Sequence, residues 1–192
     1  MNKEELFNED ISNALLSLNQ GNLILYPTDT IWGIGCDATN PEAVKKIFNL
    51  KQRTDSKSMI VLVDSQESLN NVVKNVPETA IGLINNTKTP LTIIYDDGVN
   101  VADNLKSEDN SLAVRITDEI FSKELCHRFG KPIVSTSANI SGNSSPSTFH
   151  EIAEEIKKGV GYIVRYRQDD HTPHIASRII KVPDKGDISI LR

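Results

Sequence analysis

Polar side chains gather in three short stretches of this sequence, and each stretch borders an apolar run. Hydroxyl, amide and charged groups at strand ends are well placed to bind a ligand, because open α/β sheets hold ligands at such edges. The three stretches are therefore the candidate functional residues. They are YPTDTIWG at 26–33, NLKQRTDSKS at 49–58 and VSTSANISGNSSPS at 134–147.

The second stretch carries three cations, Lys51, Arg53 and Lys57. Lys51 and Arg53 point to one side if the segment is extended, because side chains alternate along extended backbone. Arginine offers a planar pair of donors to phosphate or carboxylate, and lysine offers a point charge. The cluster predicts an anion site, but it also fits a solvated basic turn that complements the C-terminal dipole of the preceding helix.

In the third stretch, a predicted strand leads into Ser135, Thr136, Ser137 and Asn139. These hydroxyl and amide groups, together with backbone N–H groups, present hydrogen-bond partners at a sheet edge. Ser137 and Asn139 share a side if the chain stays extended. The alternative interpretation is an ordinary turn in which serine and asparagine take their usual capping roles.

The first stretch ends a predicted strand in Pro-Thr-Asp-Thr and then turns apolar again at Trp32. Pro27 fixes the exit of the chain from the strand. Gly33 and Gly35 allow another segment of backbone to approach closely. Asp29 has two interpretations: its carboxylate binds the ammonium of a ligand, or it caps the turn.

Metal and thiol chemistry have little support in the sequence. His171 and His174 flank a Thr-Pro pair, but no cysteine or acidic pattern completes a ligand set. Cys36 and Cys126 have no partner at short spacing. We therefore expect no metal site built from protein ligands, and two reduced, buried thiols.

A scaffold of mixed helices and strands must position the three stretches. Helices and strands mix without strict alternation, which favours an α/β fold of α+β type with a mixed sheet, in a single domain over residues 1–192. Apolar spacing and turn residues predict helices at 3–19, 41–50, 65–73, 77–85, 118–129 and 148–158. They predict strands at 23–26, 59–63, 90–95, 111–116, 132–135, 162–166, 175–182 and 188–191.

The composition is typical of a folded, acidic protein, with 38% hydrophobic residues and a net charge of −5. An acidic chain argues against tight, independent binding of RNA or DNA, which usually needs a basic face. No apolar run approaches the ~18 residues that cross a bilayer. The early acids Glu4 and Glu5 argue against a secretory leader. We therefore expect a cytoplasmic protein without membrane contact.

Taken together, the three stretches resemble the signature of the YrdC-like family, the threonylcarbamoyl-adenylate synthases. That signature is an apolar strand followed by Pro-Thr-(Asp/Glu)-Thr-x-(Tyr/Trp/Phe)-Gly-x-Gly, then Lys-x-Arg, then Ser-x-Asn. The matching residues here are 27–35, Lys51-Gln52-Arg53 and Ser137-Ala138-Asn139. Two further segments, TPLTIIY at 89–95 and LAVRIT at 112–117, are also similar to the family.

The resemblance implies a fold and a reaction. The fold is a twisted mixed sheet around a basic cavity, in the short, single-domain form of the family. The reaction converts L-threonine, bicarbonate and ATP into threonylcarbamoyl-adenylate and pyrophosphate, by attack of a carbamate oxygen on the α-phosphorus. A separate tRNA-modifying transferase complex then uses the product on the adenosine next to the anticodon. Mg²⁺ accompanies ATP on its phosphates, and direct tRNA binding is weak at most.

The resemblance also implies roles for individual residues. Two positions depart from the family, because Leu62 stands where many relatives have histidine and Lys181 where many have aspartate. The residues implied in catalysis are Lys51, Arg53, Ser137 and Asn139. Those implied in threonine binding are Thr30, Arg115, Ser135 and Ser177. Those implied in ATP binding are Arg53, Lys57, Ser111, Ser137, Ser145 and Arg192.

Two other functions compete with the synthase. One is a non-catalytic module that binds double-stranded RNA or tRNA in the same basic cavity. The acidic composition weighs against this function, and a steep loss of RNA affinity with salt would favour it. The other is a carbamoyl-transfer domain of a larger maturation enzyme. The sequence weighs against it because it contains no zinc-finger or acylphosphatase-like extension.

Overall fold

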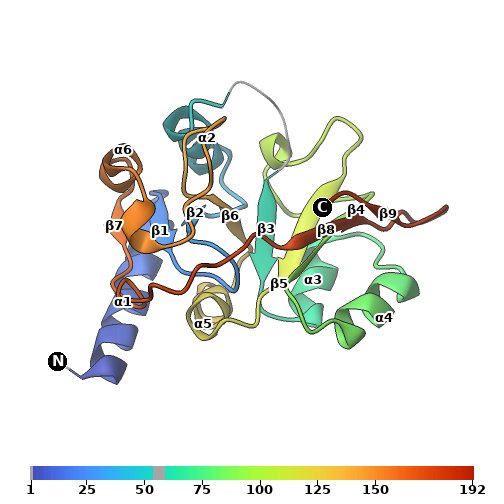
Figure 1. Ribbon diagram of the computed structural model, residues 1–192. Coiled ribbons are helices and arrows are strands. Elements are labelled where there is room, and N and C mark those ends of the chain that lie inside the picture. The colour runs from blue at the N-terminus through green and yellow to red at the C-terminus, as the bar shows by residue number, and fades with distance from the viewer. Residues whose placement is uncertain (1, 54–58) are drawn as a thin grey trace.

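A computed structural model describes residues 2–53 and 59–192 of the protein. The strands in these residues are β1 (Ile24–Tyr26), β2 (Gly33–Gly35), β3 (Ile60–Val63), β4 (Leu91–Tyr95), β5 (Leu112–Ile116), β6 (Ile133–Ser137), β7 (Tyr162–Ile163), β8 (Arg178–Lys181) and β9 (Ser189–Ile190). They form one sheet in the order β7-β1-β2-β6-β3-β5-β4-β8-β9 (Figure 1). Parallel and antiparallel pairs both occur, so the predicted mixed α/β class is confirmed.

Helices surround this sheet, and α1 packs against β1 and β7 while α3 and α5 pack against β3 (Figure 1). The α-helices are α1 (Lys3–Asn19), α2 (Pro41–Leu50), α3 (Gln66–Val72), α4 (Glu78–Asn86), α5 (Ile120–Phe129) and α6 (Glu154–Lys158). The 3₁₀ helices in the described part of the chain are η1 (Asp103–Leu105) and η2 (Phe149–Glu151).

The strand register brings distant parts of the sequence together in the middle of the sheet. Arg115 of β5 pairs with Leu62 of β3, and Ile60 of β3 pairs with Ser135 of β6. On the other side of β6, Ser137 pairs with Gly33 of β2. The sheet therefore carries the glycine-rich end of the first stretch, the third stretch and Arg115 on neighbouring strands.

Local chemistry explains how α2 delivers the second stretch. The Asn40 side chain accepts hydrogen bonds from two backbone N–H groups at the start of the helix, and Pro41 occupies a first-turn position where no N–H is needed. Ala43, Val44 and Ile47 form the buried face. The helix ends at Leu50, and Lys51 is its C-terminal cap. The fixed end of α2 therefore sets the direction in which Lys51 and Arg53 leave the helix.

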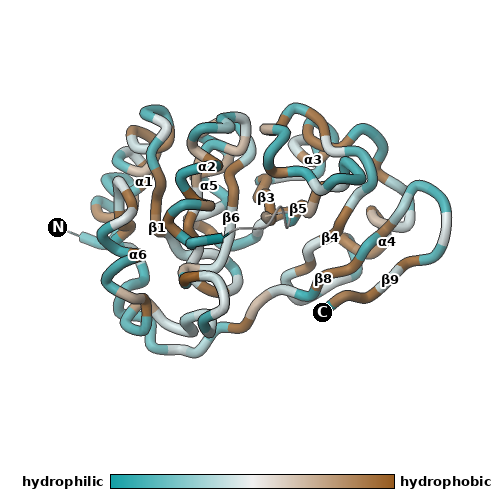
Figure 2. Tube along the Cα trace, turned by 90° about the horizontal axis from the view of Figure 1, so that it is seen from above, coloured by the Kyte–Doolittle hydropathy of each residue, from teal (hydrophilic) through white to brown (hydrophobic). Residues whose placement is uncertain are grey.

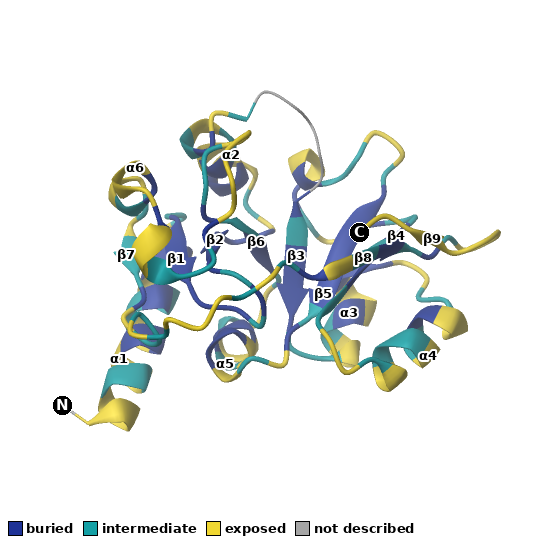
Figure 3. Ribbon diagram, in the orientation of Figure 1, coloured by how far each residue is buried: buried dark blue, intermediate teal, exposed yellow. Residues whose placement is uncertain are grey.

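The core lies between the sheet and the helices. The central strands are mostly buried, while exposed residues lie on the outer helix faces and loops (Figure 3). The same strands are largely apolar along their length (Figure 2). Ile24, Leu25, Ile34 and Leu62 are fully buried. The core is therefore assembled from strands that alone are too short to be stable.

The chain between β7 and β8, here called the crossing segment (residues 164–177), runs in front of the sheet from one half to the other (Figure 1). Arg167 has a positive φ of 65°, which is uncommon for a residue with a side chain. The segment ends at Ser177, whose hydroxyl lies 2.8 Å from that of Thr92 in β4. The crossing segment thus brings late residues onto the middle of the sheet.

Some predicted elements are wrong in extent. The predicted helix at 148–158 is broken into η2 and α6, with Ile152 and Ala153 in extended conformation between them. The predicted strands at 162–166 and 175–182 shorten to β7 and β8, because only those residues find a partner strand. β2 was not predicted, and its Gly-Ile-Gly sequence pairs with strands on both sides.

Candidate active site

Eight of the predicted site residues line one small cavity of about 190 Å³, hereafter the small cavity. They come from regions that lie far apart in the sequence, which the sheet and the crossing segment bring together. Trp32, Ile60 and Ile179 add apolar walls. The eight are Thr30, Arg53, Arg115, Ser135, Ser137, Ser145, Ser177 and Arg192.

The other predicted residues lie elsewhere. Lys51 and Asn139 are beside the small cavity but are not among its lining residues. Ser111 is buried in the turn before β5, where its N–H donates to the Asp109 carboxylate (3.1 Å). Lys57 lies outside the described residues.

Lys51 is buried within the turn that follows β6. Its ammonium donates to the carbonyl oxygens of Ser137 and Asn139, the latter at 2.6 Å, and lies 3.4 Å from the Asn139 side-chain oxygen. The Asn139 amide group in turn donates to the carbonyl of Asn143 (2.7 Å). Burial, with a smaller contribution from the charge of Arg53, lowers the pKa of Lys51 to about 8. Lys51 therefore holds the shape of the Ser-x-Asn turn.

Arg115 is the centre of a buried hydrogen-bond network. One terminal nitrogen donates to Thr92 Oγ1 (3.4 Å) and the other to Thr30 Oγ1 (3.2 Å). Thr92 also shares a hydrogen bond with Ser177. Three of the four residues predicted for threonine binding are therefore linked through Arg115. Thr92 itself was not predicted, because a single threonine within a strand gives no signal of function.

Asp29 also reaches Arg115. Asp29 Oδ1 lies 3.0 Å from Arg115 Nε. Among the described residues neither of these two buried atoms has a hydrogen-bond partner of good geometry, so the pair is held by charge. Burial raises the pKa of Asp29, although the positive charge of Arg115 acts in the opposite direction. The Asp29 carboxylate, for which the sequence left two interpretations open, thus lies against the Arg115 guanidinium.

Close backbone packing explains the glycines of the first stretch. A Cβ at Gly35 would lie 2.7 Å from the Tyr26 ring and 2.9 Å from the Val134 carbonyl oxygen. At Gly33 it would lie 3.0 Å from Ser135 Oγ. The prediction that backbone approaches these glycines closely is confirmed for Gly35, whereas the atoms near Gly33 belong to side chains. Their packing brings β2 against β6 and so places Ser135 at the small cavity.

Three arginine side chains line the small cavity. Of its described lining residues, the charged ones are Arg53, Arg115 and Arg192. Arg192 Nε donates to the Ser177 carbonyl oxygen (3.0 Å), and burial, followed by the charge of Arg115, lowers the pKa of Arg192. Arginines gathered around hydroxyl groups favour an anionic ligand with planar carboxylate or phosphate groups.

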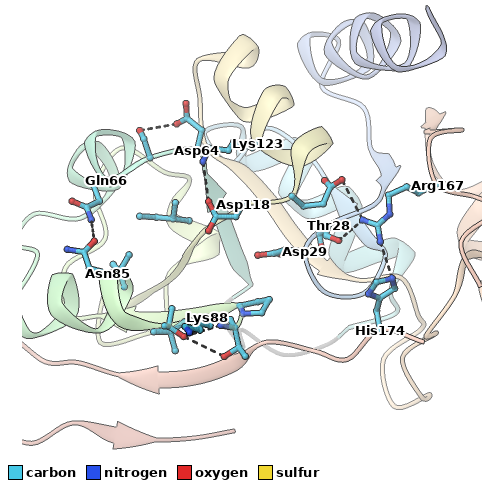
Figure 4. Close-up of a pocket in the computed structure, with 18 residues that line it drawn as sticks. Thr28, Asp29, Asp64, Gln66, Asn85, Lys88, Asp118, Lys123, Arg167 and His174 are labelled. Atoms are coloured by element: carbon cyan, nitrogen blue, oxygen red, sulfur yellow. Dashed lines mark hydrogen bonds and ion pairs between the residues drawn. The ribbon is translucent and has the colours of Figure 1, made fainter. Parts of the chain in front are cut away.

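A second, larger cavity of about 830 Å³, hereafter the large cavity, lies at Asp29 (Figure 4). Asp29 lines it, together with Arg167 and His174 of the crossing segment. Arg167 donates to the Thr28 carbonyl (3.2 Å) and pairs with Asp170 (3.0 Å). These contacts fasten the crossing segment to the loop that carries Asp29 and Thr30.

The described part of the chain contains no group of three or more His, Cys, Asp or Glu side chains arranged to hold a metal ion. Within the same residues no helix has both the length and the apolar character to cross a membrane. Cys36 and Cys126 are free and buried, as predicted, and burial raises the pKa of both thiols.

Comparison with known proteins gives consistent relatives. Residues 17–192 match the Sua5/YciO/YrdC family, described as "Telomere recombination". A threonylcarbamoyl-AMP synthase of Vibrio parahaemolyticus is 33% identical over 160 residues, which cover 82% of this chain and 86% of that protein. E. coli YciO shares the fold, with a TM-score of 0.79 and 22% identity over 97% of this chain and 89% of YciO.

A solved structure also connects the fold with an amino acid. P. abyssi Sua5 complexed with L-threonine is similar to this chain with a TM-score of 0.84 and 28% identity over 95% of this chain. The match covers 53% of the Sua5 chain, so this chain spans about half the length of that relative.

Proposed function

The chain belongs to the Sua5/YciO/YrdC family, and on that premise we propose that it makes threonylcarbamoyl-AMP from L-threonine, bicarbonate and ATP, with release of pyrophosphate. The observation that carries this proposal is the convergence of Thr30, Arg115 and Ser177 on one buried network at the small cavity. The family resemblance alone assigned these three residues to one amino acid, and they come from distant parts of the chain.

The small cavity suits the amino acid. Its volume of about 190 Å³ lies below the roughly 300–1,000 Å³ of pockets that hold drug-sized ligands. The Arg115 fork pairs with the threonine carboxylate, and the surrounding hydroxyls of Thr30, Ser135 and Ser177 satisfy its ammonium and side-chain hydroxyl. Burial in the strand network fixes these groups before the substrate arrives.

The nucleotide occupies the mouth of the small cavity in this proposal. Ser145 and Arg192 are exposed there, and Arg53 is half-buried. Arg53 and Arg192 neutralise phosphate oxygens, and the Ser137 turn supplies further donors. Mg²⁺ accompanies the ATP phosphates, because the described charged residues that line the small cavity are arginines, which do not ligate metals. The basic character of the cavity and the role of Lys57 stay predictions.

Lys51 has a positioning role in this proposal. Its ammonium holds the carbonyls of Ser137 and Asn139 and does not line the small cavity. The proposed catalytic quartet then divides into Arg53 and Ser137, which face the ligand, and Lys51 and Asn139, which shape the turn. Ser111 contributes through the turn before β5. Its direct contact with ATP stays a prediction.

The chemistry needs little covalent participation by the protein. The carbamate oxygen attacks the α-phosphorus, and pyrophosphate leaves. Holding the amino acid and the nucleotide in line, and neutralising the phosphate charge, account for catalysis of such a step. We propose that the protein works in the cytoplasm and passes its product to a tRNA-modifying transferase complex.

The direct test incubates the purified protein with ATP, L-threonine and labelled bicarbonate. We expect pyrophosphate release that depends on both threonine and bicarbonate, and label in an adenylate product. Pyrophosphate release without threonine dependence, from a folded sample, would contradict the proposal. Salt-dependent binding of tRNA in the absence of turnover would instead favour the RNA-binding alternative.

A further inference from the structure

Asp29 is the described acidic side chain that pairs with Arg115, and the two side chains line different cavities. Asp29 lines the large cavity (Figure 4). Arg115 lines the small cavity. The two side chains are 12% and 3% exposed, and Oδ1 lies 3.0 Å from Nε. The contact is therefore largely shielded from water, where a charge interaction is stronger than at the surface.

Stability does not account for this pair. Burial raises the pKa of Asp29 despite the attraction of Arg115, so the ionised carboxylate is not fully compensated in the folded protein. The two facing atoms also lack good hydrogen-bond alignment with any described residue. A buried ion pair is in general weak evidence for stabilisation. A role in function explains the pair better.

The donors of Arg115 indicate that role. A guanidinium has five N–H donors in one plane. Nε faces Asp29, and the two terminal nitrogens each use one donor, toward Thr92 and Thr30. One N–H then stays on each terminal nitrogen. A carboxylate can accept from both terminal nitrogens of one guanidinium in a bidentate pair.

We propose that Asp29 is a positioning residue that fixes the plane of the Arg115 guanidinium, and thereby sets the affinity of the small cavity for the carboxylate of the amino-acid substrate. This inference rests on the proposed function. The Asp29 carboxylate and the hydroxyls of Thr30 and Thr92 contact the three nitrogens of the guanidinium. The guanidinium plane is therefore fixed, and its remaining N–H groups point toward the substrate carboxylate. Without Asp29 the guanidinium turns about its long side chain.

The test compares Asp29→Asn with Asp118→Asn, a matched control. Asp118 also lines the large cavity, but its exposed carboxylate pairs with Lys123. For Asp29→Asn we expect the KM for threonine to rise roughly tenfold or more, with the KM for ATP within about twofold of wild type. A general structural defect would not raise the KM for threonine while leaving the KM for ATP unchanged. Asp118→Asn should leave both constants within about twofold.

Two further variants keep the test decisive. Asp29→Glu retains the charge but displaces it, so its threonine KM should lie between wild type and Asp29→Asn. This variant also serves if Asp29→Asn does not fold. In an Arg115→Lys background, Asp29→Asn should raise the threonine KM by no more than about twofold further, because both changes affect one contact.

The outcomes separate the two proposals. A wild-type protein without threonine-dependent pyrophosphate release overturns the proposed function. An active wild type, with folded Asp29 variants whose threonine KM stays within about twofold, overturns the role of Asp29 alone. Equal rises in the KM for threonine and for ATP overturn it as well.

Discussion

The ammonium of Lys51 lies 2.6 Å from the backbone carbonyl oxygen of Asn139, a residue 88 positions later in the chain. This contact joins the end of α2 to the turn after β6. It places two parts of the family signature in direct contact, and it occupies the lysine with backbone oxygens. Removing Lys51 should therefore act first on the geometry of the turn.

We expect Lys51→Met to lower turnover at least roughly tenfold, and to lower the free energy of unfolding by about 1–3 kcal/mol, because buried carbonyls lose their charged donor. Urea unfolding and pyrophosphate release measure the two effects. Lys45→Met on the exposed face of α2 is the control, and it should change neither quantity appreciably. A stable variant with normal turnover would contradict the positioning role.

Lys51 also predicts a pH dependence of stability. Burial lowers its pKa to about 8, from a usual value of 10.5. The folded chain therefore holds this proton less tightly than the unfolded chain, so the contribution of Lys51 to stability rises as the pH rises from about 8 toward 10. The free energy of unfolding of wild type minus that of Lys51→Met should increase over this window. A difference that is flat or falls with pH would be inconsistent with the lowered pKa.

The planar guanidinium of Arg115 should matter for binding threonine and not for binding ATP. Arg115→Lys keeps the charge but loses the planar pair of donors. We expect its KM for threonine to rise roughly 10- to 100-fold, in line with the loss of hydrogen bonds between charged groups, while the KM for ATP changes little. Arg178→Lys, at an exposed position of β8, is the matched control. Similar losses for threonine and ATP would place Arg115 outside the amino-acid site.

Thr92 should matter for threonine use although the sequence did not mark it. Its hydroxyl joins Ser177 to Arg115, and Thr92 is fully buried. Thr92→Val keeps the shape but removes the hydroxyl, so we expect a loss of about 1–2 kcal/mol in the free energy of unfolding, together with a several-fold higher threonine KM. Thr79→Val on the exposed side of α4 controls for the change in side chain. Equal behaviour of the two variants would remove Thr92 from the network.

Two glycines should respond oppositely to alanine. Gly35→Ala places a methyl group 2.7 Å from the Tyr26 ring, so we expect the free energy of unfolding to fall by about 1–3 kcal/mol. Gly82 lies within α4 and has no atom within 4 Å of a new Cβ. Gly82→Ala should therefore raise the free energy by about 0.5–1 kcal/mol. Thermal or urea unfolding checks both signs, and a neutral Gly35→Ala would show that β2 and β6 separate easily.

The sequence alone predicted the elements whose signals are local. Asn40 and Pro41 marked the start of α2, and Gly130 marked the end of α5, where it adopts a left-handed conformation. Caps and apolar spacing act within a few residues, so one segment contains the whole signal. The three polar stretches and the family they resemble were visible for the same reason.

Only the tertiary structure decided what depends on partners far away in the sequence. β2 is a strand because β1 and β6 pair with it, since Gly-Ile-Gly has little preference for a strand by itself. Thr92 and Asp29 gain their importance only where Arg115 lies against them. Hydrogen bonds and charge interactions act over a few ångströms in space, and the folding of the sheet determines which residues come that close.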